Sequence, residues 1–466
     1  MTAIDAVIMA AGKGTRMKSR LPKVLHRLAG RALLDHAMAG AQALDARSIV
    51  VITGNGAEQV EAAVAGWMRP GASAPVFVRQ EPQLGTGHAV QQAVPVLPDD
   101  GIALILNGDV PLIEAATLKA LVENSGPRKV ALLSVDMPDP TGYGRIIRSR
   151  DAVWAIVEHK DATEEQREIR EVYAGFMALP NALLKRWLAK LTNDNAQKEY
   201  YLTDIVKLAV DDGADVVAVK APDKVQVDGV NSPSQLAALE RAYQLRQANR
   251  FMEQGVRISD PARFDVRGVL DCGRDVEIDV NCVFEGSVSL GDGVRIGANC
   301  VIANARIEAG AVIHPFTHIE GEKAGVRVGE GALVGPFARL RPGADLGPEV
   351  HIGNFVEVKN ATLARGAKAN HLAYLGDATV GERVNYGAGS ITANYDGANK
   401  HRTVIEEDVH IGSNCVLVAP VTIGRGGTVG GGSVITKDTP AGALSIARGK
   451  QVGIPDWKRP QKKPKD

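Results

Sequence analysis

A glycine-rich stretch near the start of the chain could hold a phosphate chain. Residues 10–17 read Ala-Ala-Gly-Lys-Gly-Thr-Arg-Met and follow a short aliphatic run. Glycines let backbone amides approach phosphate oxygens closely, and Arg16 and Lys23 add positive charge. A dinucleotide-binding Gly-x-Gly-x-x-Gly would need glycine at Met17, and a Walker A loop would need Ser or Thr directly after Lys13. The stretch therefore predicts a phosphate loop of neither type, although a Gly-x-Gly alone would also fit a tight turn.

The segments around this loop predict a parallel, doubly wound α/β sheet. Aliphatic runs alternate with amphipathic segments, an order typical of such sheets. The runs are residues 6–10, 49–53, 76–78, 102–106 and 130–135, and the amphipathic segments include 33–44 and 57–67. Ligands bind at the carboxyl ends of parallel strands, where the glycine loop and Asp109 would lie. Asp109 is thus a candidate metal carboxylate, although a strand-end cap would show the same short motif.

A period of six residues governs the second half of the chain. Aliphatic side chains recur at every sixth position over much of 266–444, as in Val328, Val334, Leu340, Leu346, Ile352 and Val358. This period predicts a solenoid of short parallel strands, about ten coils long, in which each coil buries its aliphatic residues by stacking on the next. The period fails at 308–322 and 386–400, so we expect these segments to leave the wall and carry function.

One helix is predicted between the two patterns. Residues 232–255 begin with Ser232 as an N-cap and Pro233 at the first helical position. The expected domains are residues 1–231, a linker helix at 232–255, and 256–466 with a basic, mobile tail.

The composition narrows the classes of function. The 466 residues include 54 basic and 54 acidic side chains, and this balance disfavours a general nucleic-acid or membrane-surface binder. The four cysteines show no Cys-x-x-Cys spacing, so we expect free thiols in a reducing cytoplasm. The sequence has neither a signal-peptide pattern nor a run of eighteen apolar residues, which predicts a soluble cytoplasmic protein.

The N-terminal motifs resemble those of sugar-nucleotide pyrophosphorylases, and specifically the uridylyltransferase half of bifunctional enzymes that make UDP-N-acetylglucosamine. The matching motifs are residues 10–17, 21–23, 80, 83–87, 108–111, 141–145, 158–160, 199–204 and 229–231. The resemblance implies a Rossmann-like nucleotidyltransferase domain that transfers uridylyl from UTP to N-acetylglucosamine 1-phosphate. It implies Mg²⁺ at Asp109 and Asn231, and substrate contacts at Ala10, Ala11, Gly12, Arg16, Lys23, Gln80, Gly85, Thr86, Gly144, Glu158 and Asn231. Asn107 and Tyr173 stand where relatives carry other residues.

The C-terminal motifs resemble the acetyltransferase half of the same enzymes, at residues 337–343, 353–359, 371–377 and 394–397. The resemblance implies a left-handed parallel β-helix of hexapeptide repeats, a homotrimer, and acetyl transfer from acetyl-CoA to the amine of glucosamine 1-phosphate. That amine must lose a proton, and the motif match makes His371 the general base. Implied substrate contacts are Arg341, Lys359, Tyr374 and Asn385; implied acetyl-CoA contacts are Ala388, Asn394, Tyr395, Ser413, Gly431 and Arg448.

Other functions remain open on the sequence alone. The solenoid could be structural or regulatory in a sugar nucleotidyltransferase with one activity, or the whole chain could be a non-catalytic scaffold. His314 and His318 are spaced like a zinc pair of the γ-class carbonic anhydrases, but Pro315 between them prevents a helix that would align them. We expect these two histidines to lie in a solvated or polar-packed loop.

Overall fold

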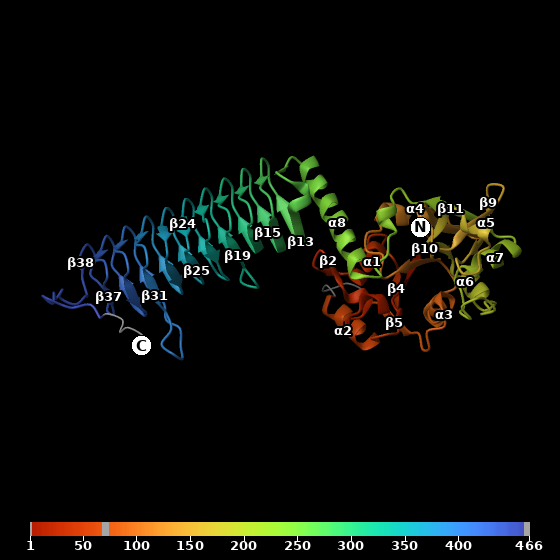
Figure 1. The fold of residues 1–466 in the computed structure, drawn as a ribbon, viewed down its shortest axis with the longest axis horizontal. Coiled ribbons are helices and arrows are strands. Elements are labelled where there is room, and N and C mark those ends of the chain that lie inside the picture. The colour runs from red at the N-terminus through yellow and green to blue at the C-terminus, as the bar shows by residue number, and fades with distance from the viewer. Residues whose placement is uncertain (1, 68–73, 461–466) are drawn as a thin grey trace, which may run out of the picture. The chain divides into compact units, whose positions relative to one another are not determined.

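The computed structural model describes residues 2–67 and 74–460, which form two compact units (Figure 1). The units are Met1–Arg246 and Gln247–Asp466, so the division falls inside helix α8 (Pro233–Glu253). Ser232 Oγ accepts a hydrogen bond from the Gln235 backbone N–H at 3.3 Å, which confirms the predicted N-cap. The last part of the predicted tail, residues 461–466, lies outside the described residues.

The first unit is built on a sheet with the strand order β11-β7-β10-β6-β1-β4-β5. These strands are β1 (Ile4–Met9), β4 (Ser48–Thr53), β5 (Val76–Arg79), β6 (Ile102–Asn107), β7 (Lys129–Asp136), β10 (Glu171–Pro180) and β11 (Asp215–Lys220). The expectation of a wholly parallel sheet is wrong, because β10 runs antiparallel to both β6 and β7. The chain reaches β10 from the hairpin of β8 (Arg145–Ser149) and β9 (Ala152–Val157), and an antiparallel strand can be entered without a long crossover helix.

Helices cover both faces of this sheet, as a doubly wound domain requires. One face packs against α1 (Leu33–Gln42), α2 (Ala57–Trp67) and α4 (Ala115–Glu123), and the other against α3 (Thr86–Gln91), α6 (Asn181–Leu188) and α7 (Asp204–Asp211). Within β1, Ile8 packs in the first layer and Val7 in the second, as strand alternation dictates.

The central strands bring together two segments that the sequence predicts to be functional. Met9 at the end of β1 pairs with Asn107 at the end of β6, and the Gly108 backbone N–H donates to the Met9 carbonyl at 3.0 Å. The glycine loop and Asp109 therefore leave the same edge of the sheet, at the point where the strand order reverses.

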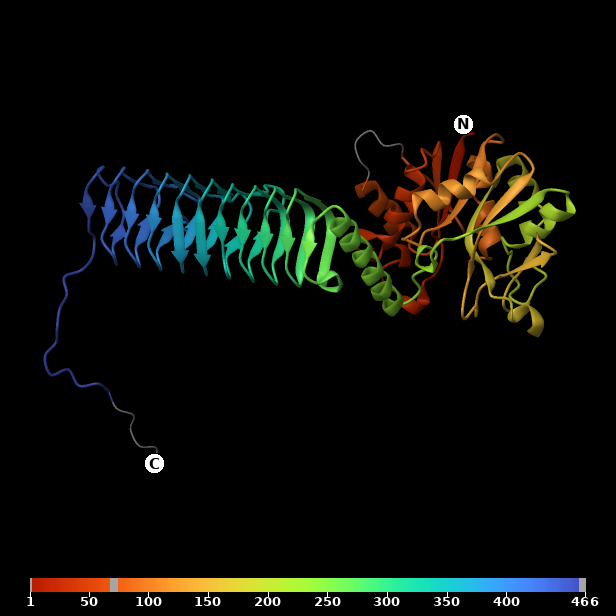
Figure 2. The same ribbon diagram turned by 90° about the horizontal axis from the view of Figure 1, so that it is seen from above.

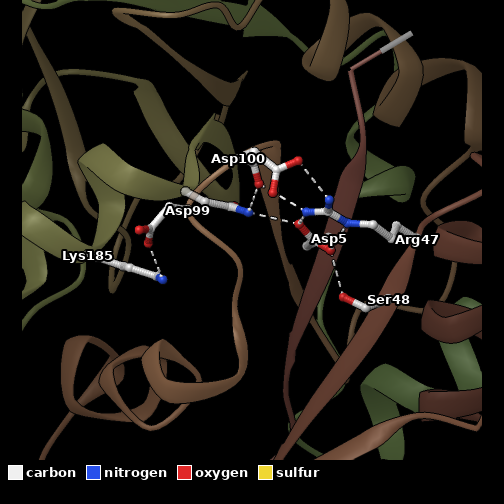
Figure 3. A network of polar contacts seen from close by, with 7 residues as sticks. Asp5, Arg47, Ser48, Asp99, Asp100 and Lys185 are labelled. Atoms are coloured by element: carbon white, nitrogen blue, oxygen red, sulfur yellow. Dashed lines mark hydrogen bonds and ion pairs between the residues drawn. The ribbon is translucent and has the colours of Figure 1, made fainter.

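A polar network fixes the opposite end of the same strands (Figure 3). Asp5 of β1 is fully buried and accepts hydrogen bonds from Arg47 Nη2 at 2.6 Å, Ser48 Oγ at 2.8 Å and Asn181 Nδ2 at 2.8 Å. Burial alone would raise the pKa of the Asp5 carboxyl, but these donors outweigh burial and hold that pKa below its usual value. One carboxylate thus ties together β1, the start of β4 and the start of α6.

The second unit is a three-walled solenoid of parallel strands (Figures 1 and 2). Wall 1 holds β12 (Arg257–Ile258), β14 (Glu277–Ile278), β16 (Arg295–Ile296), β18 (Val312–Ile313), β21 (Leu333–Val334), β24 (His351–Asn354), β27 (Lys368–His371), β30 (Asn385–Tyr386), β33 (His410–Ile411), β36 (Thr428–Val429) and β38 (Leu444–Ser445). Wall 2 holds β19 (His318–Glu320), β22 (Arg339–Leu340), β25 (Glu357–Lys359), β28 (Tyr374–Gly376), β31 (Ile391–Ala393), β34 (Val416–Val418) and β37 (Val434–Ile435). Wall 3 holds β20 (Val326–Val328), β23 (Asp345–Leu346), β26 (Thr362–Leu363), β29 (Ala378–Val380), β32 (Thr403–Ile405) and β35 (Val421–Ile423). Three longer strands, β13 (Phe264–Cys272), β15 (Cys282–Leu290) and β17 (Val301–Ile307), pair across the walls of the first coils.

The predicted solenoid core is confirmed, because the aliphatic residues of the sixfold series are buried in one continuous cluster. All four cysteines are free thiols, and burial raises the pKa of Cys282 to about 11 and of Cys300 to about 12.

The two predicted excursions begin later than expected. Residues 308–320 stay on the wall, because one five-residue step from Ile302 to Ile307 shifts the period, after which Ile313 and Ile319 are buried six and twelve residues on. Only residues 321–325 leave the wall there. Likewise β30 and β31 stay on the wall, and the second excursion comprises residues 394–402, in which Tyr395 bridges to Lys400.

Candidate active sites

The loop after β1 is shaped by close approach of Lys23. Gly14 has a φ of 60°, and a Cβ there would lie 2.8 Å from Lys23 Cβ, so both backbone and space demand glycine. Ala10 and Ala11 are buried beneath the loop. Among the described residues, no atom lies within 4 Å of the Cβ position of Gly12, so the loop presents open space there.

Lys23 also joins two predicted metal ligands. Its Nζ forms an ion pair with Asp109 Oδ2 and donates to Asn231 Oδ1 at 3.2 Å. The Val230 backbone N–H donates to the Asp109 carbonyl at 2.9 Å, which holds the two segments side by side. A carboxylate and an amide oxygen thus converge on one cationic group. Oxygens of these types are the ligands that Mg²⁺ prefers, so the donor set fits this ion.

A cavity of about 380 Å³ opens beside this cluster. Its lining includes the predicted Arg16, Asp109, Gly144, Glu158 and Asn231. A Cβ on Gly144 would lie 2.8 Å from Ile156 Cγ2, so glycine keeps this part of the wall thin.

Glu158 is a half-buried carboxyl within that lining. Burial raises its pKa, the nearby carboxylates Asp204, Asp161 and Glu199 raise it further, and a hydrogen bond from Thr203 Oγ1 at 2.9 Å lowers it. Tyr173 lines the same cavity, and its buried Oη has no hydrogen-bond partner among the described residues.

Gln80, Gly85 and Thr86 form a separate group that does not line this cavity. Gln80 Nε2 donates to the Gly85 carbonyl at 2.9 Å, and Thr86 Oγ1 accepts from the Leu202 backbone N–H at 3.0 Å. Gly85 has a φ of 109°, and a Cβ there would lie 2.6 Å from the Tyr200 carbonyl oxygen. These contacts pack the segment that carries these three predicted substrate contacts against residues 199–202.

In the solenoid, His371 stands at the corner where wall 1 turns into wall 2. Five consecutive coils each place one residue at this corner, and in chain order these residues are Asn354, His371, Ala388, Ser413 and Gly431. Backbone hydrogen bonds align them: the carbonyl of each of the first four residues accepts from the N–H of the residue that comes directly after its counterpart in the next coil. We call this row the His371 corner. His371 Nδ1 lies 2.9 Å from Asn354 Oδ1, and Arg448 Nη1 donates to the Gly431 carbonyl at 2.8 Å.

The other predicted acetyl-transfer residues gather where wall 2 turns into wall 3, here called the Lys359 corner. Arg341 and Lys359 occupy this corner in adjacent coils, and Gly376 occupies it in the next coil. The Tyr374 side chain lies over Gly376, since a Cβ on Gly376 would fall 2.2 Å from the Tyr374 Oη. The buried carboxylate of Asp377 accepts hydrogen bonds from the side-chain amides of Asn394 and of Asn360, the latter at 2.5 Å.

The structure therefore divides the predicted residues between two corners. Asn394 and Tyr395 begin the excursion at the Lys359 corner, whereas Ala388, Ser413, Gly431 and Arg448 lie at the His371 corner. Asn385 lies on β30 of wall 1, paired with Lys368 and His410. The ammonium of Lys400, inside the excursion, and burial both lower the pKa of Lys359.

Comparison with known proteins assigns the family. The MobA-like NTP transferase domain family matches residues 6–174, and the bacterial transferase hexapeptide family (six repeats) matches residues 272–304 and 402–437. The bifunctional protein GlmU of Albidiferax ferrireducens is 72% identical over 98% of this chain and 100% of its own length. The chain belongs to the bifunctional GlmU family. The GlmU protein of Polaromonas naphthalenivorans is 73% identical over 99% of this chain and 98% of its own length.

A solved nucleotidyl transferase from Methanothermobacter thermautotroptrophicus is 20% identical, with a TM-score of 0.37, over 53% of this chain and 99% of its own. Membership of the GlmU family confirms the predicted fold class and a bifunctional enzyme that joins a nucleotidyltransferase domain to hexapeptide acyltransferase repeats.

Two further expectations concern histidines and membranes. His318 lies on strand β19 rather than in a loop, so the predicted loop for His314 and His318 is wrong for the second of them. Within residues 2–67 and 74–460, no three His, Cys, Asp or Glu side chains are grouped to hold a metal ion. In the same ranges, every helix is too short or too polar to cross a bilayer.

Several residues at these sites were missed from the sequence. Thr203 and Asn354 lie within the matched motifs 199–204 and 353–359, but they meet Glu158 and His371 only through tertiary contacts, so the sequence predicted no role for them. Asp377 could have been found, because it closes the segment 371–377 that carries His371.

Proposed function

We propose that this GlmU family member acetylates glucosamine 1-phosphate with acetyl-CoA and then converts N-acetylglucosamine 1-phosphate and UTP to UDP-N-acetylglucosamine and pyrophosphate. The observation that carries the proposal is the coincidence of full-length similarity to GlmU proteins with two polar centres, one in each unit. The product would serve cell-wall and lipopolysaccharide synthesis in the cytoplasm.

In uridylyl transfer, an oxygen of the sugar phosphate attacks the α-phosphorus of UTP, and the bond to pyrophosphate breaks. Two polyanions must meet, so the protein has to supply positive charge rather than a strong base. Lys23 and Arg16 supply that charge, the amides around Gly12 face the triphosphate, and Gly144 and Glu158 in the cavity wall contact the sugar. Asp109 and Asn231 would hold Mg²⁺, which neutralises phosphate charge when bound.

In acetyl transfer, the sugar amine attacks the thioester carbon, a C–N bond forms, and the C–S bond breaks to release coenzyme A. The Nε2 atom of His371 takes a proton from the attacking amine. This proton is then passed to the departing sulfur, so coenzyme A leaves as the thiol. Arg341 and Lys359 hold the sugar phosphate, and Tyr374 and Asn385 orient the sugar. The residues that bind coenzyme A are Ala388, Asn394, Tyr395, Ser413, Gly431 and Arg448.

A homotrimer would complete this second site. His371 and Lys359 lie at opposite ends of a wall 2 strand, so one sugar between them is best held by corners of two neighbouring copies. Mixed oligomers of His371→Ala and Lys359→Ala chains should then regain thiol release that neither variant shows alone. Failure of every mixture to regain activity would contradict a shared site.

The test of both activities is mass spectrometry of products formed from glucosamine 1-phosphate, acetyl-CoA, UTP and Mg²⁺. UDP-N-acetylglucosamine is expected, together with thiol release that depends on glucosamine 1-phosphate and is abolished by His371→Ala. Uridylyl transfer to N-acetylglucosamine 1-phosphate without any thiol release would instead favour a single-activity nucleotidyltransferase with a structural solenoid.

A further inference from the structure

Among residues 2–67 and 74–460, Asn354 is the polar side chain that forms a hydrogen bond with the ring of His371. Its Oδ1 lies 2.9 Å from Nδ1, and strand pairing between β24 and β27 sets the two residues directly opposite one another. The pair is 17 residues apart, the length of one coil, so the contact follows from the register of the solenoid.

The backbone around Asn354 is well fixed for such a contact. The next residue, Phe355, has a φ of 56° at the corner, and its ring stacks on that of Phe337 at 5.4 Å between centroids. The Asn354 carbonyl accepts from the Leu372 backbone N–H at 3.0 Å, which ties it to the residue after His371. The backbone at Asn354 and at the residue after it is therefore anchored.

The chemistry of an amide oxygen decides what the contact does. An amide oxygen only accepts hydrogen bonds, so a bond between Oδ1 and Nδ1 requires the proton on Nδ1. The lone pair is then on Nε2, the atom that must accept a proton from the sugar amine.

We infer that Asn354 is a positioning residue, which holds His371 in the Nδ1–H tautomer and in a fixed ring orientation for acetyl transfer. The inference rests on the proposed role of His371 as general base. Other titratable groups on the neighbouring strands of wall 1 are His351 on β24, Lys368 on β27 and Tyr386 on β30. His351 lies three residues before Asn354, Lys368 lies three residues before His371, and Tyr386 is buried. The side-chain hydrogen bond of the His371 ring is therefore made with Asn354.

Two substitutions separate positioning from general structure. Asn354→Ala removes the acceptor, and kcat/KM for thiol release should fall about 10- to 100-fold at every pH, as expected for a lost hydrogen bond to a charged group. Asn354→Asp keeps an acceptor but adds negative charge, which favours the protonated ring. In Asn354→Asp, the acid limb of kcat/KM for thiol release should move up by about one pH unit. Above that limb, kcat/KM should stay within about threefold of the wild-type value.

The matched control is Asn370→Ala, the same change one residue before His371 in β27, which should leave the pH profile unchanged. Uridylyl transfer by each preparation reports on the integrity of the other unit. A loss of equal size in Asn354→Ala and Asn354→Asp with an unmoved acid limb would overturn the inference, as would Asn354→Ala activity within twofold of wild type.

A measurement without substrate keeps this inference distinct from the proposed function. Protein labelled with ¹⁵N at its ten histidines should give a His371 signal, assigned by its absence in His371→Ala, with Nδ1 protonated and Nε2 free in the neutral ring. In Asn354→Ala, the ¹⁵N chemical shifts of His371 Nδ1 and Nε2 should move toward each other, because the ring then samples both neutral tautomers. A wild-type ring protonated on Nε2 would overturn the inference even if acetyl transfer is confirmed, whereas absent thiol release with the expected tautomer would contradict only the function.

Discussion

Replacing Asp5 by asparagine should destabilise the first unit more than any rim substitution in the same network. The carboxylate is fully buried, and its two oxygens accept from Arg47, Ser48 and Asn181 (Figure 3). Breaking a buried ion pair costs about 3–5 kcal/mol, but Arg47 keeps 35% of its side chain exposed and can regain water. Since the amide retains one oxygen acceptor, we expect a loss of about 2–3 kcal/mol, or a fall in Tm of about 5–10 °C.

The matched control is Asp99→Asn, which removes a carboxylate that pairs with Lys185 at the rim of the network. The Asp99 side chain is 84% exposed, so its ion pair should contribute about 0.5 kcal/mol or less. Urea unfolding of the full chain, followed by tryptophan fluorescence, measures both variants. Trp187 is fully buried on α6, the helix that Asn181 begins, so its emission reports on the region that Asp5 anchors.

The dependence on pH has a definite sign. The folded-state pKa of Asp5 is depressed, so its carboxylate contributes stability above the unfolded-state value of about 3.9, and the contribution is lost as the pH falls through the folded value. The difference between wild type and Asp5→Asn should therefore be complete at pH 7 and shrink below about pH 4. Equal stability of Asp5→Asn and Asp99→Asn at pH 7, or a difference that grows in acid, would refute the reasoning.

Three further outcomes are expected at the two sites. Asp109→Ala should lower uridylyl transfer at least about 100-fold, because it removes an anionic ligand from the Lys23 cluster, while thiol release in the same preparation stays within twofold. Gly376→Ala should lower thiol release about 10-fold or more, because the new Cβ displaces the Tyr374 hydroxyl; a tolerated alanine would show that this hydroxyl has no fixed place. Thr203→Val removes a hydrogen bond that lowers the pKa of Glu158, so the acid limb of kcat/KM for the sugar phosphate in uridylyl transfer should move to higher pH, and an unmoved limb would contradict a role for ionised Glu158.

Periodicity predicted the solenoid well because each coil obeys the same burial rule. The sixfold series marks residues that the walls bury, and even the segment 308–320 obeys it after one five-residue step. The antiparallel course of β10 could not be predicted in this way, since strand direction depends on which neighbour the chain meets rather than on its own pattern.

For the two sites as well, features set by local sequence could be predicted, whereas contacts set by the tertiary structure could not. The glycine loop and Asp109 could be placed together from sequence, because both follow strands that end at one edge of a doubly wound sheet. The contacts of Glu158 with Thr203 and of His371 with Asn354 could not, because they depend on side chains brought together across 45 and 17 residues of chain.

Register explains why the excursion can add chemistry without disturbing the wall. Asn354 and His371, neighbours in adjacent coils, are 17 residues apart, whereas Ser390 and Cys415, which also lie in adjacent coils, are 25 apart because residues 394–402 intervene. The excursion leaves at the Lys359 corner, so Ala388 and Ser413 keep their place in the row that begins with Asn354. Corner insertions can therefore bring new groups toward the proposed sugar-phosphate site, while the wall keeps His371, the proposed general base, and its neighbours at a fixed spacing of one strand, about 4.8 Å.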